Sequence, residues 1–152
     1  MDIRKQPGFT LIELVLVITI LGILAAFAVP RFISISADAR LATVNSLAGS
    51  LRSAAALAHS VALVQAAGAS SSISVDGATV TMVQHYPAGT ADGIVAALQD
   101  LTGFTSSASA GIVTFQVKGV ATPASCQVQY TQASGTGGAP TITVTASTSG
   151  CS

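Results

Sequence analysis

The longest apolar run of the chain lies near its N-terminus. Residues 9–29 read FTLIELVLVITILGILAAFAV, with Glu13 as the only charged side chain. A helix of this length spans roughly 30 Å, which is the thickness of the hydrocarbon core of a bilayer. Arg4 and Lys5 precede the run, and basic residues favour the cytoplasmic side of a membrane. The pattern therefore predicts a membrane-inserted helix that starts in the cytoplasm and leaves the rest of the chain outside.

A cleaved secretory signal peptide is the alternative interpretation of this run. Its basic start and the sequence Ala26-Phe27-Ala28 imitate a signal peptide with an A-x-A cleavage site. However, the run is longer than the usual apolar region of about 7 to 15 residues. Glu13 also makes the free energy of membrane insertion less favourable by on the order of 3 kcal/mol. A signal peptide that is removed gains nothing from this cost, whereas a retained helix can use the charge.

A second helical pattern follows Pro30. Proline lacks a backbone N–H and disfavours helix at the residue before it, so a kink or local melting is expected between Gly22 and Pro30. The pattern then resumes and is expected to end at Gly68 and the serines 70–72. Apolar residues recur in it at steps of three and four, namely at Leu41, Val44, Leu47, Leu51, Ala54, Ala58 and Val61.

The remaining residues alternate between apolar and polar, as in half-buried strands. Asp76-Gly77 predicts a two-residue hairpin turn, and a short helix is expected over 90–101, capped by Thr90 or Asp92 and followed by Gly103. The predicted strands are 73–75, 79–83, 112–117, 127–131 and 141–145. These elements predict an α+β fold, in which a long N-terminal helix packs on a C-terminal antiparallel sheet.

The composition of the chain argues against several classes of function. Hydrophobic residues make up 50% of the chain and charged residues only 8%, against a usual charged share of about 25%. Six basic and six acidic residues cancel, which argues against nucleic-acid binding through a basic face. The sequence holds no phosphate-binding glycine loop, metal-ligand cluster or nucleophile motif. We therefore expect no enzyme activity and no cofactor, and interpret His59 and His85 as packing or surface residues.

The two cysteines, Cys126 and Cys151, lie close to the C-terminus. An even pair in a chain with an export-like N-terminus suggests a disulfide, and two unrelated buried thiols are the alternative. Their spacing does not fit a close metal-ligand pair. A bridge between them would stabilise the fold by roughly 3 to 4 kcal/mol in the chain-entropy model.

The residues at the start of the apolar run resemble a known motif. Gly8-Phe9-Thr10-Leu11-Ile12-Glu13 follows a short basic leader and is similar to the prepilin motif of type IV pilins and type II secretion pseudopilins. The resemblance implies that a membrane peptidase cuts after Gly8 and methylates the new amine of Phe9. It also implies that Glu13 is the filament-assembly glutamate, and that Gly22 and Pro30 weaken and kink the helix.

Physical chemistry gives Glu13 the same role. Cleavage creates an α-amino group with an ordinary pKa near 8, and this cation needs a partner in an apolar filament core. A neighbouring subunit, staggered along the axis, could bring the Glu13 carboxylate to the amine of Phe9. Each charge would be compensated only on assembly, so the pair would also set the axial register between neighbouring subunits. A stray acid tolerated near the membrane surface is the alternative.

The C-terminal part carries a second resemblance. The Asp76-Gly77 hairpin, the Tyr86-Pro87 pair, the Cys-x-Val-x-Tyr segment 126–130 and the terminal Gly150-Cys151 are similar to the mannose-sensitive haemagglutinin branch of type IV pilins. The cysteine pair also resembles the C-terminal disulfide loop of this family. Type II secretion pseudopilins usually lack that loop and bind calcium there, and the acids of this region are not arranged like a calcium loop.

Together these features predict a structural subunit of a type IV pilus. We expect a leader over 1–8, a transmembrane and filament-core helix half over 9–30, and a globular head over 31–152. The precursor would sit in the inner membrane of a Gram-negative bacterium before it polymerises into a surface fibre for adhesion, motility or DNA uptake. Its expected partners are other copies of the chain, the prepilin peptidase, the assembly platform and a cytoplasmic ATPase. A pseudopilin of a type II secretion or competence system is the alternative.

Overall fold

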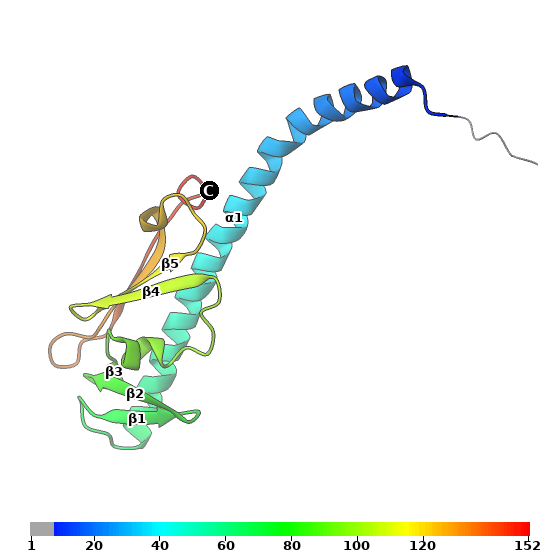
Figure 1. Cartoon of the computed structure of the whole chain (residues 1–152). Helices are drawn as coiled ribbons and strands as arrows, with labels where there is room; N and C mark the ends of the chain where they lie inside the picture. The colour runs from blue at the N-terminus through cyan, green and yellow to red at the C-terminus, as the bar shows by residue number, and fades with distance from the viewer. Residues whose placement is uncertain (1–7) are drawn as a thin grey trace, which may run out of the picture. The chain divides into compact units, whose positions relative to one another are not determined.

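A computed structural model describes residues 8–152, except for the side chains of residues 29, 30 and 32–34. The rest of the predicted leader, residues 1–7, lies outside the described part. Contacts divide the chain into two compact units, Met1–Ile35 and Ser36–Ser152, and each is described by itself. Figure 1 follows the chain from the N-terminal helix to the red C-terminus.

A single helix, α1, extends over Leu11–Val64. It runs without interruption through Gly22 and Pro30, so the kink or melting expected there remains a prediction. The helix ends before Gly68, where the sequence pattern had placed its end. Ala66 adopts a left-handed φ of 48°, while the N–H groups of Ala66 and Ala67 donate to the carbonyls of Leu63 and Ala62. This is the geometry of a Schellman cap, formed with alanine where glycine is usual.

The second unit contains two antiparallel sheets. A three-stranded sheet has the order β1-β2-β3 and a four-stranded sheet the order β4-β5-β6-β7. Their strands are β1 Ser72–Val75, β2 Ala78–Val83, β3 Tyr86–Pro87, β4 Phe104–Ser109, β5 Ile112–Val117, β6 Cys126–Thr131 and β7 Thr141–Ala146. The predicted α+β class is confirmed, with a long helix and antiparallel strands.

Two tight turns set the strand register. Asp76 and Gly77 have φ values of 49° and 82° and join β1 to β2, which confirms the predicted hairpin with a turn of type I′ character. Ala110 and Gly111, with φ values of 51° and 77°, join β4 to β5 in the same way. β4 was not expected from the sequence, because all its residues after Phe104 are exposed and show no apolar alternation.

The short helix expected over 90–101 is much shorter in the structure. Its helical turn covers only Ala91–Val95, and Gly93 within it has φ −100° and ψ −109°, outside the helical region. Thr90 does occupy the N-cap position, but its side chain makes no capping hydrogen bond. The prediction of a longer, side-chain-capped helix was wrong because Gly93 folds its backbone closely against Ala88, where a β-carbon would clash.

The C-terminal half of α1 supplies one side of the hydrophobic core. Val44, Leu47 and Leu51 pack with the inward residues of β5 and β6, including Phe115 and Tyr130. Further along the helix, the buried side chains pack on β1 and β2, and this cluster consists of Ala58, Ala62, Ile73, Val80 and Met82. Figure 1 shows β1–β3 beside the C-terminal end of α1. The helix therefore serves as a common support for both sheets.

Candidate functional site

The N-terminus of α1 is closed by a reciprocal capping box. The Thr10 backbone N–H and hydroxyl donate to Glu13 Oε2 at 2.9 and 2.6 Å, and the Glu13 N–H donates to Thr10 Oγ1 at 3.3 Å. Such a box satisfies two backbone donors that a helix start leaves without an intrahelical partner. Glu13 is therefore a helix cap in the single chain, in addition to any role between chains.

Sequence reasoning missed Thr10, although a signal for it was present. The spacing T-x-x-E before an apolar run is the signature of a capping box. The predicted cleavage site lies directly before it, since Gly8 and Phe9 precede the helix and lie outside regular structure. Phe9 is 76% exposed. The structure thus places the Gly8–Phe9 bond in an accessible segment next to a fixed helix start.

The helix that follows this cap presents apolar side chains in all directions. The window Leu11–Ala28 has a mean hydropathy of 2.7 and none of it is buried within the chain. Thr19, a polar residue in this window, donates its hydroxyl to the Val15 carbonyl at 2.7 Å, which satisfies it within the helix. This window is long and apolar enough to cross a membrane. It also leaves a large apolar surface that the chain itself does not cover.

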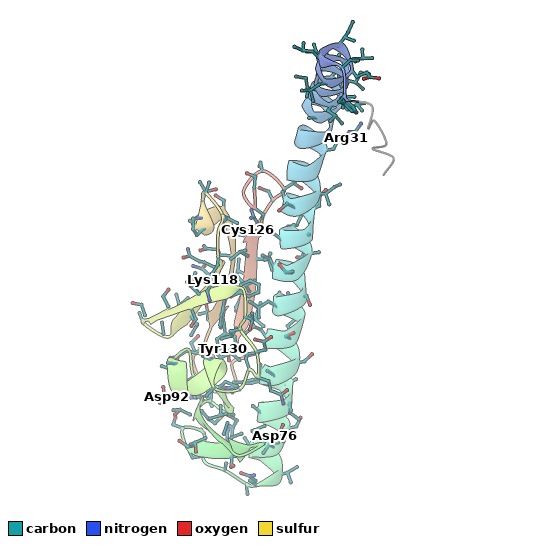
Figure 2. All side chains as sticks on the ribbon, turned by 45° about the vertical axis from the view of Figure 1, so that its right-hand side comes forward. Arg31, Asp76, Asp92, Lys118, Cys126 and Tyr130 are labelled. Atoms are coloured by element: carbon teal, nitrogen blue, oxygen red, sulfur yellow. A yellow bond between two sulfur atoms is a disulfide. The ribbon has the colours of Figure 1, made fainter. Side chains whose placement is uncertain are left out.

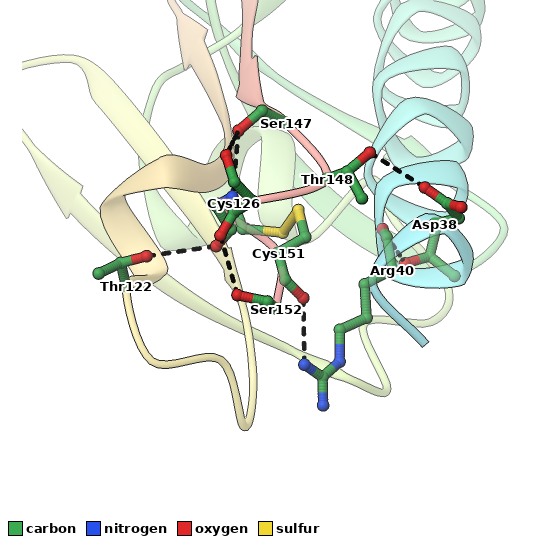
Figure 3. The surroundings of a disulfide bond; sticks show 11 residues. Asp38, Arg40, Thr122, Cys126, Ser147, Thr148, Cys151 and Ser152 are labelled. Atoms are coloured by element: carbon green, nitrogen blue, oxygen red, sulfur yellow. Dashed lines mark hydrogen bonds between the residues drawn. A yellow bond between two sulfur atoms is a disulfide. The ribbon is translucent and has the colours of Figure 1, made fainter. Parts of the chain in front are cut away.

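The cysteine pair closes the C-terminal region. Cys126, at the start of β6, and Cys151 form a disulfide, and both residues are fully buried. The bridge joins two ends of a segment that contains β6 and β7. Figure 3 shows the bridge beside the helix and the last residues of the chain. The disulfide predicted from the sequence is present in the structure.

Two polar contacts attach this disulfide region to α1. Thr148 Oγ1 donates to Asp38 Oδ1 at 3.0 Å, and Arg40 Nη1 donates to the Cys151 carbonyl at 3.1 Å; both are drawn in Figure 3. Sequence reasoning gave these charged residues no partner, and no local signal could have done so, because they are more than 100 positions from their partners. The C-terminal loop is thus held by a covalent bond and by the helix.

The two histidines lie together in the second unit, Ser36–Ser152, which is called the head from here on. The rings of His59 and Tyr86 stack with centroids 4.1 Å apart, and His59 Nδ1 forms a 3.0 Å hydrogen bond with the His85 carbonyl. His59 and His85 are both partly buried. Among residues 8–152, no group of three His, Cys, Asp or Glu side chains is placed to hold a metal ion.

Comparison with known proteins agrees with this geometry. Residues 3–29 match the family model described as the prokaryotic N-terminal methylation motif. The fimbrial protein EcpC of Eikenella corrodens is 37% identical over 103 residues, which cover 66% of this chain and 67% of that protein. This chain belongs to the type IV pilin family. Pilins of this family are structural proteins and not enzymes.

Two further pilins match over shorter segments. The narrow-pilus major component PilA5 of Thermus thermophilus is 51% identical over 64 residues, which cover 42% of this chain and 52% of that protein. The type IV major fimbrial protein FimA of Dichelobacter nodosus is 47% identical over 49 residues, 32% of this chain and 31% of FimA. The chain therefore spans only about half of the first relative and a third of the second. No solved structure matches the chain.

Proposed function

We propose that this pilin is the structural subunit of a type IV pilus and polymerises through its N-terminal helix. The observation that carries the proposal is the window Leu11–Ala28, which has no buried residue in the single chain and whose N-terminal end is capped by Thr10 and Glu13. So large an apolar surface needs either lipid or other protein around it. A bilayer would supply the first environment before assembly, and a bundle of identical helices would supply the second.

Processing would precede assembly. A prepilin peptidase would cut between Gly8 and Phe9 and methylate the amine of Phe9. The exposure of Phe9 and the match to the methylation motif support this assignment. Gly8 adds a second argument, because a residue without a side chain leaves the scissile bond unobstructed.

The capping box refines the proposed role of Glu13. Both bonds from Thr10 go to Oε2, and a carboxylate has about four acceptor sites on its two oxygens. The same carboxylate can therefore keep its cap and accept the amine of a neighbouring Phe9. The cap would hold Glu13 ready at the helix surface, so that assembly would need little rearrangement of this side chain.

The other partners follow from this assembly scheme. Monomers would wait in the inner membrane of a Gram-negative bacterium until an assembly platform and a cytoplasmic ATPase extract them into the extracellular fibre. Such a fibre could serve adhesion, motility or DNA uptake. Gly22 and Pro30 would let the helix bend or melt while the filament is stretched or packed.

Within the family, we place the chain in the mannose-sensitive haemagglutinin branch. The Asp76-Gly77 turn, the Tyr86-Pro87 strand and the Cys126–Cys151 bridge support this placement. A pseudopilin of a type II secretion or competence system is the second candidate. The disulfide favours the pilus subunit, because major pseudopilins usually hold this region with calcium.

The proposal is tested by the intact mass of the protein and by electron microscopy of material sheared from cells. We expect filaments whose subunit begins at N-methylated Phe9 and contains one disulfide. Uncleaved precursor from a Gly8→Ala variant, with no filaments, would support the assigned site. A mature protein that begins at Val29 would instead identify a secreted protein and overturn the proposal.

A further inference from the structure

Two open grooves lie along α1 in the head, and the charged side chains that line them have opposite signs. The first, here called the acidic groove, has a volume of about 810 Å³ and is formed by α1, the β1–β2 turn and the segment after Val95. Its charged residues are Asp76 and Asp100, and no basic side chain lines it. Figure 2 shows Asp76 on the turn beside the helix. Leu57, which is 55% exposed, contributes an apolar wall.

The second groove, here called the basic groove, has a volume of about 310 Å³. It lies between α1 and the ends of β3 and β7 and contains Arg52 and His59 but no acidic side chain. Its remaining walls are largely apolar, with Pro140 and Ile142 opposite the helix. The guanidinium of Arg52 is thus the fixed positive charge of this groove.

The grooves lie on opposite flanks of the same stretch of helix. Positions 50, 54 and 57 line the acidic groove and positions 52, 56 and 59 the basic groove. At about 100° of rotation per residue, these two sets fall on either side of the buried stripe that includes Leu51 and Ala58. The helical parts of the two linings also overlap in sequence, so both grooves are at nearly the same height.

We propose that the two grooves are the complementary halves of one repeated contact between heads, in which Arg52 of one copy enters the acidic groove of the next. The proposed occupant is therefore a second copy of this chain. Membrane insertion would orient all copies alike, so their helices would be parallel and the two flanks would meet without a large axial shift. This inference rests on the proposed polymerisation and specifies which surfaces of the heads take part.

The type of symmetry strengthens this assignment. A contact between two different patches of the same molecule is heterologous, and when it does not close into a ring it produces an open helical polymer. A twofold dimer with either groove on its axis would instead place that groove against its own copy and bring like charges together. The charge pattern therefore favours a filament over a closed dimer.

Asp76 and Asp100 of the acidic groove are suited to bind a guanidinium group. Asp76 and Asp100 are both exposed. Hydrogen bonds from the side chain and backbone of Thr102 hold the pKa of Asp100 below its ordinary value, so this carboxylate is ionised at neutral pH. Arg52 presents a planar set of five donors that matches carboxylate geometry. The contact combines such charge pairing with burial of the exposed Leu57 side chain.

A charge-swap experiment on the full-length chain tests the contact. Arg52→Glu should reduce sheared filaments roughly tenfold or more, because like charges would then face each other. Asp76→Lys combined with Asp100→Lys should do the same, and the triple variant should recover much of the wild-type yield. Lys118→Glu is the matched control, since Lys118 is exposed, lines neither groove and should leave the yield unchanged.

A chemical cross-link gives a second, independent readout. Arg52→Lys keeps the positive charge and adds an amine that a zero-length carbodiimide can couple to a carboxylate. In assembled filaments we expect covalent dimers whose linked peptides join position 52 to Asp76 or Asp100. Wild-type filaments, treated in the same way, should lack this linkage because arginine is not coupled.

The outcomes separate this inference from the proposed function. Wild-type chain that forms no filaments would defeat the proposed function. Normal filaments from Arg52→Glu, or cross-links from position 52 only to other residues, would overturn the head contact while polymerisation stands. An Arg52→Glu defect that the aspartate reversals do not relieve would also overturn it, because the basic groove would then serve a different anionic partner. Normal membrane levels of each variant, measured by immunoblot, exclude misfolding as the cause.

Discussion

The hydroxyl of Tyr130 donates a 2.7 Å hydrogen bond to the carbonyl of Pro87. Tyr130 lies on β6 of the four-stranded sheet and Pro87 on β3 of the three-stranded sheet. Both residues are fully buried, so neither group can turn to water instead. This one bond therefore joins the two sheets inside the core.

Replacement of Tyr130 by phenylalanine should destabilise the head. The change removes the donor and leaves the Pro87 carbonyl without its partner in the core, which typically costs about 1 to 3 kcal/mol. Urea unfolding of the full-length chain in detergent, followed by circular dichroism, measures the loss. Tyr86→Phe is the matched control, because the stack on His59 does not need the hydroxyl. An equal loss in both variants would contradict the special role of the bond.

The same residue should make the head sensitive to alkali. Burial, and then the nearby Tyr86, raise the pKa of Tyr130 above its ordinary value of 10.0. The folded state therefore holds this proton more tightly than the unfolded state, and stability falls as pH rises above the unfolded value. We expect the contribution of Tyr130 to the unfolding free energy to be constant below about pH 10 and to decrease above it. The difference in unfolding free energy between wild type and Tyr130→Phe should therefore shrink as the pH rises above about 10. The same urea titrations, repeated at each pH, measure it.

Gly89 should tolerate no side chain. A β-carbon there would overlap the backbone of Gly111, in the turn between β4 and β5, and overpacking of this kind costs about 1 to 3 kcal/mol. Gly49→Ala is the control, because Gly49 is helical with open space around it and alanine is favoured over glycine in helices by up to about 1 kcal/mol. The urea midpoint should therefore fall for Gly89→Ala and rise for Gly49→Ala. A neutral Gly89→Ala would contradict the close packing.

Local signals predicted much of this fold. Asp76-Gly77 marked its hairpin because both residues adopt positive φ, and the alternation over Ile112–Val117 marked β5 because only one of its faces is buried. β4 was not predicted from the sequence, for the opposite reason. It is the edge strand of its sheet and its residues after Phe104 are exposed, so no apolar periodicity was available.

The functional motif was equally local, whereas the contacts that hold the C-terminal region of the second unit were not. Gly8 directly precedes the apolar run, Phe9 and Glu13 lie at its start, and all three were singled out from the sequence. Thr10 could have been added from its spacing to Glu13. In contrast, the hydrogen bond from Arg40 to the Cys151 carbonyl joins residues that are 111 positions apart. Such contacts depend on the final packing of the helix on the sheet, which no short segment encodes.

Loss of the disulfide should loosen the C-terminal region. Cys126→Ser with Cys151→Ser removes a bridge whose loss typically costs about 2 to 5 kcal/mol in a small secreted domain. We expect a lower urea midpoint and less accumulated subunit. Asp38→Ala serves as a milder comparison, because it removes only the hydrogen bond from Thr148. If the cysteine variant were no less stable than Asp38→Ala, the bridge would not be a main support of this region.

The two roles of Glu13 can be separated with glutamine. Glu13→Gln keeps an oxygen that can accept from Thr10, and glutamine is a regular member of capping boxes, but the negative charge is lost. If pairing with the amine of a neighbouring Phe9 drives assembly, Glu13→Gln should give few or no filaments although its helix start is intact. Loss of one partner of a buried ion pair typically costs about 3 to 5 kcal/mol. Electron microscopy of sheared material and intact mass of the membrane-bound subunit measure assembly and processing separately.

Glu13→Ala and Thr10→Val complete the comparison, because each removes part of the cap. Thr10→Val preserves the charge and loses the hydroxyl, which should weaken the helix start by about 1 kcal/mol and reduce filament yield only moderately. Glu13→Ala loses the carboxylate half of the cap together with the charge, so it should insert into the membrane, be processed at least in part and assemble as poorly as Glu13→Gln. Wild-type subunits should rescue it only partly. The opposite ranking, with abundant filaments from Glu13→Gln and few from Thr10→Val, would assign Glu13 to the cap alone and remove the charge pair from the assembly mechanism.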